Sequence, residues 1–572
     1  MDNGRLRRVA IVASLSLVTA ALGSLAVNAP AIAATDGHAR PSPHLRHARS
    51  LIHNPVLNGQ GDPGTAAEPN VAALCARQLR RPNPFANPFP NVDAIVGDTV
   101  VPVGTQTGCA AAQNETPVAV NPSNPRNLVA GSNDYRVFNT REQRNDSSGW
   151  AYTSMDAGKT WANVQLPHLT FQTGATGALS DMDSAGDPAI AFGPHNSVYY
   201  ANIVFSRLNL GTGIVVSASH DGGLTWGEPS IVQLDGVDPS GNGTNTDVFN
   251  DKDWIGVDQH SGAVYVSWTR FDASASPIVV SKSVNGGSSW NARRPVSPTV
   301  ASFAPGGITP FDQGSFPVVG SDGSLFIAYE GAVCQTLACD QAGDHDAVVM
   351  AKSTNGGSSF VNKEVAINYD FPFNPDAQTQ TLTGENFRIN SYPSLAIDPT
   401  SNRLYVSWAD DRNGTYDSAG NSVRTNGDVL VSTSPNGLQW QKPITLGSSQ
   451  DEVFPAVAAY DGRVAVSYYT RKYDPKGIGL DVAINTGNGI GALKDSRIAR
   501  VTTQTSNPQV QFVGVGAVSG KVLQGVFIGD YNGLAMGRDL IAHPTWTDFR
   551  GNPTLAGSTP NQEVYSQAVQ LH

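Results

Sequence analysis

Arginine, aspartate and tyrosine side chains recur at equivalent places along this chain, although only 15% of its 572 residues are charged. Each place lies next to a short apolar segment that has the pattern of a β-strand. A planar guanidinium binds a carboxylate through two parallel hydrogen bonds, so clustered arginines indicate an acidic ligand. The candidates for binding such a ligand are Arg136, Arg388, Arg412, Arg471, Arg550 and Asp530.

Four further residues have side chains suited to nucleophilic or acid–base chemistry. Tyr469 and Tyr531 are candidate nucleophiles, but a phenol with a pKa near 10 attacks at neutral pH only beside a base. Glu330 could be that base, and Asp253 or Asp187 could be the general acid and base. The structural alternative is that Arg–Asp pairs brace neighbouring elements and that each tyrosine is a packed aromatic.

A motif of the form Ser-x-Asp/Asn-x-Gly-x-Ser/Thr-aromatic indicates which elements position these residues. It begins with residues 154–161 (SMDAGKTW) and recurs at intervals of roughly 65 to 80 residues. In each copy the acidic or amide residue can cap the N–H groups of a turn and the glycine can adopt positive φ. We expect these boxes to be structural turns, with calcium or ligand binding as the alternative role. Their capping residues are Asp156, Asp221, Asn285, Asn355 and Asn436.

Each box lies in a unit of four short strand-like segments, which in the clearest copy are residues 392–398, 403–410, 428–433 and 438–446. The first half of this unit recurs seven times, which predicts an all-β fold: a β-propeller of four-stranded antiparallel blades, seven in number, with six as the alternative. The box joins the third and fourth strands, so the candidate site residues gather at the opposite face. The last unit is one strand short, and residues 93–103 could supply that strand and close the ring.

The boxes resemble those of the bacterial sialidase (neuraminidase) superfamily, in which Asp boxes mark propeller blades. The resemblance covers residues 113–572. Residues 387–390 (FRIN) are similar to the Phe/Tyr-Arg-Ile-Pro motif of that family, although they lack its proline and precede the fifth unit. Similar boxes also occur in xyloglucan-cleaving enzymes and in sorting receptors, so they indicate the fold more than the activity.

Sialidases bind the substrate carboxylate with three arginines, and they use a tyrosine activated by a glutamate as nucleophile and an aspartate as acid and base. The resemblance therefore implies a sialidase-like exo-glycosidase that acts on an acidic sugar. Arg388, Arg412 and Arg471 would hold the sugar carboxylate, and Tyr469 or Tyr531 would react with the help of Glu330. The alternatives are a non-catalytic propeller that binds a glycan or a protein, and a polysaccharide lyase.

The chain divides into a signal peptide over residues 1–33, an irregular arm over 34–112 and the propeller over 113–572. Three arginines near the start, an apolar run over residues 9–27 and an Ala-Ile-Ala site are typical of a cleavable secretory signal. An uncleaved anchor is the alternative. We expect a secreted monomer that has no membrane contact after cleavage and binds a glycan or glycoconjugate.

Cysteine content and charge agree with export. Cys334 and Cys339 are close enough to join one loop, and Cys75 and Cys109 could tie down the arm, although four cysteines allow three pairings. The Cys334–Cys339 spacing has no second ligand pair for zinc, so no metal site and no cofactor are predicted beyond a structural calcium ion at the boxes. The net charge is −11 and no basic run follows the signal, which disfavours nucleic acid as a partner.

Overall fold

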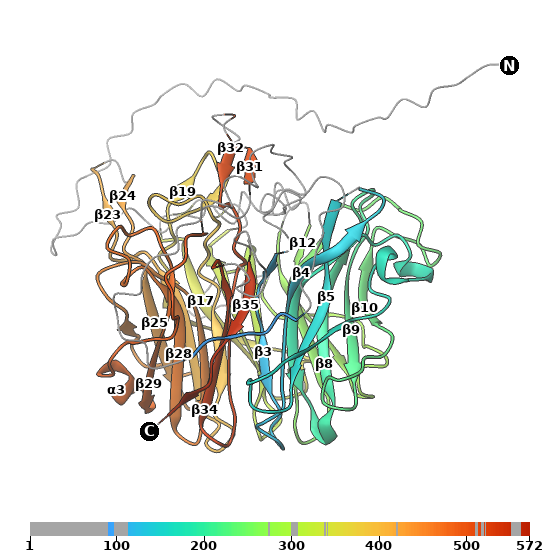
Figure 1. The fold of residues 1–572 in the computed structure, drawn as a ribbon, viewed down its shortest axis with the longest axis horizontal. Helices are drawn as coiled ribbons and strands as arrows, with labels where there is room; N and C mark the ends of the chain where they lie inside the picture. Colours follow the sequence, from blue (N-terminus) through green and yellow to red (C-terminus); the bar gives the residue numbers. More distant parts are fainter. Residues whose placement is uncertain are drawn as a thin grey trace. The chain divides into compact units, whose positions relative to one another are not determined.

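Seven four-stranded antiparallel sheets follow one another along the chain and form a β-propeller (Figure 1). The computed structural model describes residues 90–96, 112–142, 144–272, 275–298, 307–336, 339, 341, 343–418, 421–508, 513–515, 520, 522–550 and 562–571. The prediction of an all-β propeller with seven blades is confirmed, and the alternative of six blades is wrong.

The first four blades each run from an inner strand to an outer strand in chain order. Blade 1 comprises β2 (Gln113–Asn114) and β3 (Val118–Val120), β4 (Leu128–Asn139), β5 (Arg144–Ser154) and β6 (Ala162–Gln165). Blade 2 comprises β7 (Ser184–Phe192), β8 (Val198–Phe205), β9 (Thr212–Ser219) and β10 (Ser230–Asp235). Blade 3 comprises β11 (Phe249–Val257), β12 (Val264–Phe271), β13 (Ile278–Ser283) and β14 (Arg294–Pro295). Blade 4 comprises β15 (Asp312–Val319), β16 (Leu325–Val333), β17 (His345–Ser353) and β18 (Val361–Ile367).

The last three blades follow the same order, except that blade 7 takes its outer strand from the other end of the chain. Blade 5 comprises β21 (Ser394–Ile397), β22 (Leu404–Asp410), β25 (Asp428–Ser434) and β26 (Ile444–Leu446). Blade 6 comprises β27 (Glu452–Tyr460), β28 (Arg463–Thr470), β29 (Asp481–Asn488) and β30 (Ala499–Arg500). Blade 7 comprises β33 (Gly533–Met536), β34 (Ile541–Asp548), β35 (Glu563–Ser566) and β1 (Val92–Asp93), with β36 (Val569–Gln570) also paired to β34.

The strand β1 closes the ring, as the sequence predicted. Val92 pairs with Ser566 and Asp93 with Tyr565, so a strand from the predicted arm completes blade 7. Such pairing of the two ends removes a free sheet edge. The closing strand ends at Asp93, so it includes only the start of the predicted stretch; residues 97–103 of that stretch lie outside the described residues.

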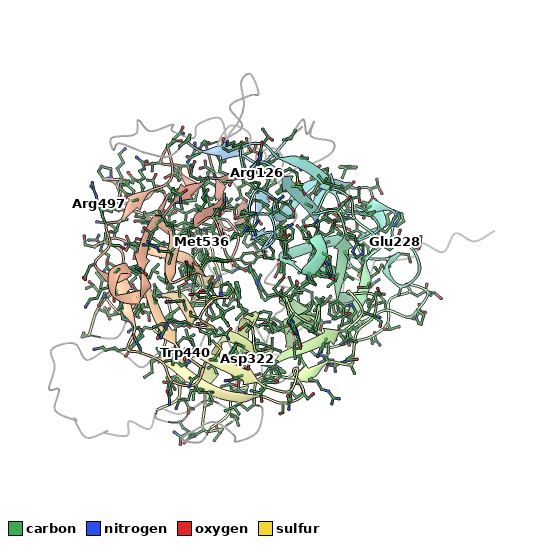
Figure 2. The ribbon with its side chains drawn as sticks, turned by 90° about the horizontal axis from the view of Figure 1, so that it is seen from below. Arg126, Glu228, Asp322, Trp440, Arg497 and Met536 are labelled. Atoms are coloured by element: carbon green, nitrogen blue, oxygen red, sulfur yellow. A yellow bond between two sulfur atoms is a disulfide. The ribbon has the colours of Figure 1, made fainter. Side chains whose placement is uncertain are left out.

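The two faces of the propeller differ in the turns that they carry. Turns between first and second strands and the boxes between third and fourth strands lie on one face, here called the box face. Figure 2 views the molecule from this face, where the turn residues Arg126 and Asp322 and the box residue Trp440 are labelled. The opposite face, here called the mouth, carries the hairpins β19 (Phe373–Asn374) to β20 (Thr379–Gln380), β23 (Thr415–Tyr416) to β24 (Ser422–Arg424) and β31 (Val513–Val515) to β32 (Val522–Gln524), at the top of Figure 1.

The core lies between neighbouring blades. Trp268, Trp408 and Trp546 occupy equivalent places in the second strands of blades 3, 5 and 7, and all three side chains are fully buried. Each packs in a cluster that joins its own blade to the preceding one. Buried tryptophans remove a large apolar area from water, so they contribute strongly to holding the blades together.

The recurring box forms the same turn in its first four copies, and the fifth copy forms a turn that is one residue shorter. In the second copy, Asp221 Oδ1 accepts hydrogen bonds from the backbone N–H groups of Leu224 and Thr225 at 2.9 Å, and its Oδ2 accepts one from the Thr225 hydroxyl at 2.6 Å. Ser219 Oγ accepts a hydrogen bond from Gly223 N at 2.9 Å, and Gly223 has a φ of 97°. The box is therefore a capped turn, as its sequence predicted.

Candidate active site at the propeller axis

The inner strands carry β-bulges near the mouth, in blades 2, 3, 4 and 6. At these bulges one residue has positive φ: Asp187 (50°), Lys252 (53°), Gly314 (63°) and Phe454 (50°). Glu115 (58°) takes the same conformation between β2 and β3 of blade 1. Positive φ strains every residue except glycine, and such strain gathers at functional sites. Bulges also re-aim side chains, and here they bring Glu115, Asp187 and Lys252 together at the axis.

Lys252 joins three carboxylates that come from three other blades. Its Nζ lies 2.9 Å from Asp187 Oδ2 in blade 2, 2.6 Å from Asp530 Oδ2 in blade 7 and 3.6 Å from Glu115 Oε1 in blade 1. The Lys252 side chain is only 7% exposed. A buried ammonium needs such partners, because its desolvation is otherwise costly.

Arg388 completes this group from the segment before β21. Its Nε donates a hydrogen bond to Asp530 Oδ1 at 2.8 Å and its Nη2 to Asp530 Oδ2 at 2.5 Å, while its guanidinium lies 5.0 Å from the Phe527 ring centroid. Burial alone would raise the pKa of Asp530, but the Arg388 and Lys252 cations outweigh burial and lower it. Asp530 is therefore an ionised carboxylate at neutral pH.

Asp253 follows Lys252 on β11, and its pKa shifts in the opposite direction to that of Asp530. Its side chain is buried, and among the described residues only its own backbone amide interacts with the carboxyl oxygens. Burial, followed by the charges of Asp187 and Asp251, raises the pKa of Asp253 well above its usual range. Burial therefore favours the protonated form of this carboxyl group, which is the form that a general acid needs.

Two more carboxyl groups of this region have raised pKa values. Burial, followed by Asp187, raises the pKa of Glu115 well above its usual range. Burial also raises the pKa of Asp251 to about 7, against the opposing effect of Lys252. We call Glu115, Asp187, Asp251, Lys252, Asp253, Arg388 and Asp530 the axial cluster. Neighbouring groups whose pKa values are pushed apart are typical of acid–base sites.

A cavity lies at the axis next to Asp253, whose carboxyl oxygens are both buried, and Asp530. Both line it, together with Trp254, Phe316 and Tyr531. Its volume is about 40 Å³, which is room for a few water molecules. A larger ligand would therefore not fit inside this cavity.

The two predicted nucleophiles do not meet the predicted base. The Tyr469 hydroxyl donates a hydrogen bond to the Thr547 carbonyl at 2.6 Å inside the core between blades 6 and 7. The Tyr531 hydroxyl donates to the Pro188 carbonyl at 2.7 Å, beside the axial cavity. Burial raises the pKa of both phenols. Neither tyrosine is therefore prepared for nucleophilic attack.

Glu330 lies elsewhere, at the mouth end of β16. Its Oε1 accepts a hydrogen bond from Asn368 Nδ2 at 2.8 Å. Burial, followed by the neighbouring Asp370, raises the pKa of Glu330 well above its usual range. Glu330 is bonded to Asn368 and the two tyrosine hydroxyls are bonded to backbone carbonyls, so the structure does not pair either tyrosine with Glu330.

Three of the arginines predicted to bind a ligand each form an ion pair with an aspartate close by in the sequence. Arg136 binds Asp134 with an Nη2–Oδ2 distance of 2.7 Å, Arg412 binds Asp410 at 2.5 Å and Arg550 binds Asp548 at 2.8 Å. In each case the partner lies two residues earlier, at the end of a second strand. Arg471 is paired with Asp451 at 2.7 Å and with Glu385 at 2.9 Å. Among the predicted arginines, only Arg388 reaches the axial cluster.

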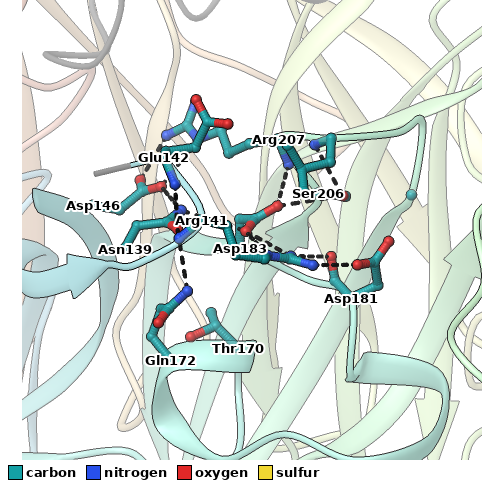
Figure 3. Close-up of polar contacts among 12 residues, drawn as sticks. Asn139, Arg141, Glu142, Asp146, Thr170, Gln172, Asp181, Asp183, Ser206 and Arg207 are labelled. Atoms are coloured by element: carbon teal, nitrogen blue, oxygen red, sulfur yellow. Dashed lines mark hydrogen bonds and ion pairs between the residues drawn. The ribbon is translucent and has the colours of Figure 1, made fainter. Parts of the chain in front are cut away.

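A similar network braces blades 1 and 2 at the mouth (Figure 3). Arg141 binds Asp181 and Asp183, and Arg207 Nη2 lies 2.7 Å from Asp146 Oδ1. The Arg207 backbone N–H also donates to Asp183 Oδ2 at 2.6 Å. These contacts support the structural alternative for most of the arginines at the mouth.

The sequence analysis did not single out Glu115 or Lys252, although both belong to the axial cluster. A signal was present in the first strands, where proline directly follows the bulge residue in Asp187-Pro188 and Phe454-Pro455. Proline within a sheet is confined to edges and bulges. Its recurrence at this place in the unit predicts a bulge, and hence a residue aimed at the axis.

The described residues show one disulfide, between Cys334 and Cys339, as predicted. The second predicted pair, Cys75 and Cys109, lies outside the described residues. No group of three or more His, Cys, Asp or Glu side chains within the described ranges is arranged to hold a metal ion. No helix in the same ranges is long and apolar enough to cross a membrane.

The fold and the axial cluster together define a seven-bladed β-propeller with a charged axial site. No protein-family model matches the chain, and no curated protein matches it. Among solved structures, the Hadza microbial sialidase Hz136 is 14% identical, with a TM-score of 0.37 over 74% of each chain. Trypanosoma rangeli sialidase in complex with sialic acid is 10% identical, with a TM-score of 0.39 over 73% of this chain and 60% of its own.

A third solved structure is the Penicillium chrysogenum alpha-L-arabinanase complexed with arabinobiose. It is 13% identical, with a TM-score of 0.33 over 56% of this chain and 93% of its own. The chain therefore spans less than two thirds of the Trypanosoma protein and most of the Penicillium protein. Likeness at this level carries no argument about activity, which depends on the residues of the site.

Proposed function

We propose that this protein is an exported glycoside hydrolase whose active site is the axial cluster. The observation that carries the proposal is Asp253, a buried residue that lines the axial cavity, whose carboxyl group has no side-chain hydrogen-bond partner among the described residues and a pKa that burial raises. Export is supported by the N-terminal signal pattern and by the Cys334–Cys339 disulfide.

The cluster offers the two carboxyl groups that glycoside hydrolysis needs. One carboxylic acid must protonate the oxygen of the leaving group, and one carboxylate must act on the sugar carbon or on the attacking water. Asp253 would be the acid. Asp530, which Arg388 and Lys252 keep ionised, would be the carboxylate. Both groups line the same cavity.

The pairing of the cations favours a neutral sugar over the acidic sugar that the sequence predicted. The cluster contains five carboxyl groups and two cations, and both cations are already bound to Asp530. The other predicted arginines are paired with Asp134, Asp410, Asp451 and Asp548. A sugar carboxylate would have to displace one of these partners before it could bind.

The test is a panel of fluorogenic glycosides offered to the purified full-length protein. The panel includes neutral pentosides and hexosides, a uronide and a sialoside. The proposal expects hydrolysis of a neutral member and its loss by about 100-fold or more in Asp253→Asn. Cleavage confined to the sialoside or uronide would overturn the neutral-sugar assignment, and an unsaturated product from a uronic acid polymer would indicate a lyase.

A non-catalytic binding propeller is the second candidate. The observation that favours it is Lys252, whose bonds to several blades are those of a structural brace. Sugar binding at the mouth without turnover of any panel member would support this candidate. The two functions are therefore separated by the same panel, read once for turnover and once for binding.

A further inference from the structure

Blade 3 has a short outer strand, and a groove runs along each side of it. The strand β14 comprises only Arg294 and Pro295, whereas β18 of the next blade spans Val361–Ile367. The segment 291–295 is exposed throughout. It separates a groove of about 340 Å³ toward blade 4 from a groove of about 580 Å³ toward blade 2. We call them the blade 3–4 groove and the blade 2–3 groove.

The blade 3–4 groove presents two cations side by side. Val280 is opposite Arg294 in the pairing of β13 with β14, and Lys282 lies two residues along the strand from Val280. Residues at this spacing share one face of a strand, so Lys282 and Arg294 both face this groove. Its far wall is the box turn of blade 4, which contributes Gly356, Gly357 and Ser358.

The blade 2–3 groove presents two more cations and an aromatic ring. Arg293 faces this side because it alternates with Arg294 along the chain. Its Nη1 donates a hydrogen bond to Gln233 Oε1 at 3.1 Å. Arg270 lies deeper and is 3.6 Å from Asp235, with its Nε buried and without a hydrogen-bond partner among the described residues. The ring of Trp290 lines the same groove.

Acidic residues are sparse around these grooves, where Asp235 pairs with Arg270, although the chain has 48 of them against 37 lysines and arginines. The described lining of the two grooves contains no Asp and no Glu. The sequence from residue 273 to residue 311 likewise contains neither, while it contains Lys282, Arg293 and Arg294. The boxes of blades 3 and 4 carry Asn285 and Asn355 where blades 1 and 2 carry aspartate. The region is therefore a positive patch on an acidic protein.

We propose that the two grooves form a binding site for an acidic polysaccharide, separate from the axial cluster. Carboxylate or sulfate groups on successive sugars would bind Lys282 and Arg294 in one groove and Arg270 and Arg293 in the other. Guanidinium and ammonium groups bind such oxyanions by charge-assisted hydrogen bonds. The proposal does not rest on the proposed glycosidase function.

The geometry favours a polysaccharide over other polyanions. Two grooves on either side of one exposed segment suit a flexible polymer with evenly repeated charges. The grooves also present side-chain amides and hydroxyls, from Gln233, Asn291 and Ser358, that match sugar hydroxyl groups. The Trp290 ring offers an apolar face for a sugar ring. A duplex nucleic acid, in contrast, would need a broad basic surface, and the rest of this chain is acidic.

The experiment measures binding of polygalacturonate, chondroitin sulfate, neutral dextran and a DNA duplex to the full-length protein by calorimetry. The protein should bind at least one of the two acidic polysaccharides, and higher salt should weaken that binding. The variant Lys282→Gln/Arg293→Gln/Arg294→Gln should raise its Kd about tenfold or more. The matched control Lys442→Gln/Lys494→Gln/Arg497→Gln removes three exposed cations from blades 5 and 6 and should leave the Kd unchanged.

Each outcome decides the proposal. Polygalacturonate and chondroitin sulfate separate carboxylate from sulfate recognition. The proposal would be overturned if dextran bound as tightly as the acidic polysaccharides or if DNA bound more tightly than they do. It would also be overturned if the two triple variants lost affinity equally. Acylation of Lys282 in the wild-type protein, followed by mass spectrometry, gives a readout that does not depend on folding of the variant. The bound polymer should slow this acylation and leave that of Lys494 unchanged.

Discussion

Lys252 Nζ lies 2.6 Å from Asp530 Oδ2, and this contact joins blade 3 to blade 7, which are not neighbours in the ring. Asp187 and Glu115 extend the same contact to blades 2 and 1. A single side chain therefore connects four blades at the axis. The same contact lowers the pKa of Asp530, so it links the stability of the ring to the chemistry of the site.

Replacing Lys252 should destabilise the protein strongly. Lys252→Met removes the cation that faces three buried carboxyl groups. Removing one partner from a buried ion pair lowers the free energy of unfolding by about 3–5 kcal/mol. The loss of stability should be smaller in acid, because protonation removes the carboxylate charges. Urea unfolding measures the free energy, with the exposed Lys494→Met as the control. A loss below about 1 kcal/mol would show that the axial contacts are not formed in solution.

Asn91 should anchor the closing strand of blade 7. Its Oδ1 accepts hydrogen bonds from the Thr503 N–H at 2.6 Å and from Arg550 Nη2 at 3.0 Å, and its Nδ2 donates to the Val501 carbonyl at 2.8 Å. Asn91→Ala should lower the free energy of unfolding by about 1–3 kcal/mol. It should also speed hydrogen exchange of the β35 amides. Asn421→Ala in an exposed hairpin is the control, and equal exchange in both variants would contradict the closure.

Glu452 should make stability fall as the pH rises. Burial raises its pKa from 4.5 to about 7 in the folded protein, despite hydrogen bonds from Ser448 and Thr470 that lower it. The folded state therefore binds the proton more tightly than the unfolded state. The resulting stabilisation is fully present below pH 4.5 and is lost as the pH rises through about 7.

The change is measured as the difference in unfolding free energy between the wild type and Glu452→Gln at a series of pH values. The wild type should lose about 3 kcal/mol relative to the variant between pH 4.5 and pH 8. The exposed Glu142→Gln is the control and should show no such trend. A difference that stays constant with pH would show that Glu452 is not buried as described.

The box turns should depend on hydrogen bonds more than on charge. Hydrogen bonds from Thr225 and Ser219 outweigh partial burial and lower the pKa of Asp221 to about 2. Its stabilising effect is therefore present above pH 3.8 and is lost as the pH falls through about 2. Asp221→Ala should cost about 1 kcal/mol at pH 7, as for loss of a turn cap.

Asn285 supplies the matched comparison for this prediction, because its side chain makes similar bonds in the box of blade 3. Asp221→Asn should therefore cost much less than Asp221→Ala, and it should remove the acid sensitivity of this box. Thermal unfolding at pH 7 and at pH 2.5 measures both effects. Equal losses in the two variants at pH 7 would contradict the capping role.

Much of the fold was predictable, because a propeller repeats one short unit. The boxes and the seven copies of the first half of the unit predicted seven blades. The strand missing from the last unit predicted that the N-terminal side of the chain closes the ring. The alternation of strands placed Asp253, Arg388 and Asp530 on the mouth side of the ring. These inferences need only strand period and turn chemistry.

The contacts of the site were less predictable, because bulges decide which side chains reach the axis. A bulge shifts the alternation of a strand, so Lys252 and Glu115 turn inward where a regular strand would not aim them. The prediction that the arginines bind an acidic ligand had a different weakness. Arg136, Arg412 and Arg550 follow an aspartate by two residues, and residues at that spacing share a face of a strand. Their local pairing is therefore the simpler expectation.

Asp253 is proposed to act as an acid because it lines the axial cavity, not merely because it is a buried carboxyl. Asp312 provides the matched control, since burial also raises its pKa well above the usual range but it does not line this cavity. The decisive measurement is kcat/KM of Asp253→Asn and Asp312→Asn on the best neutral glycoside of the panel, with folding checked by circular dichroism. The account predicts a loss of about 100-fold or more in Asp253→Asn and a change of less than about threefold in Asp312→Asn. Equal activities in the two variants would contradict it.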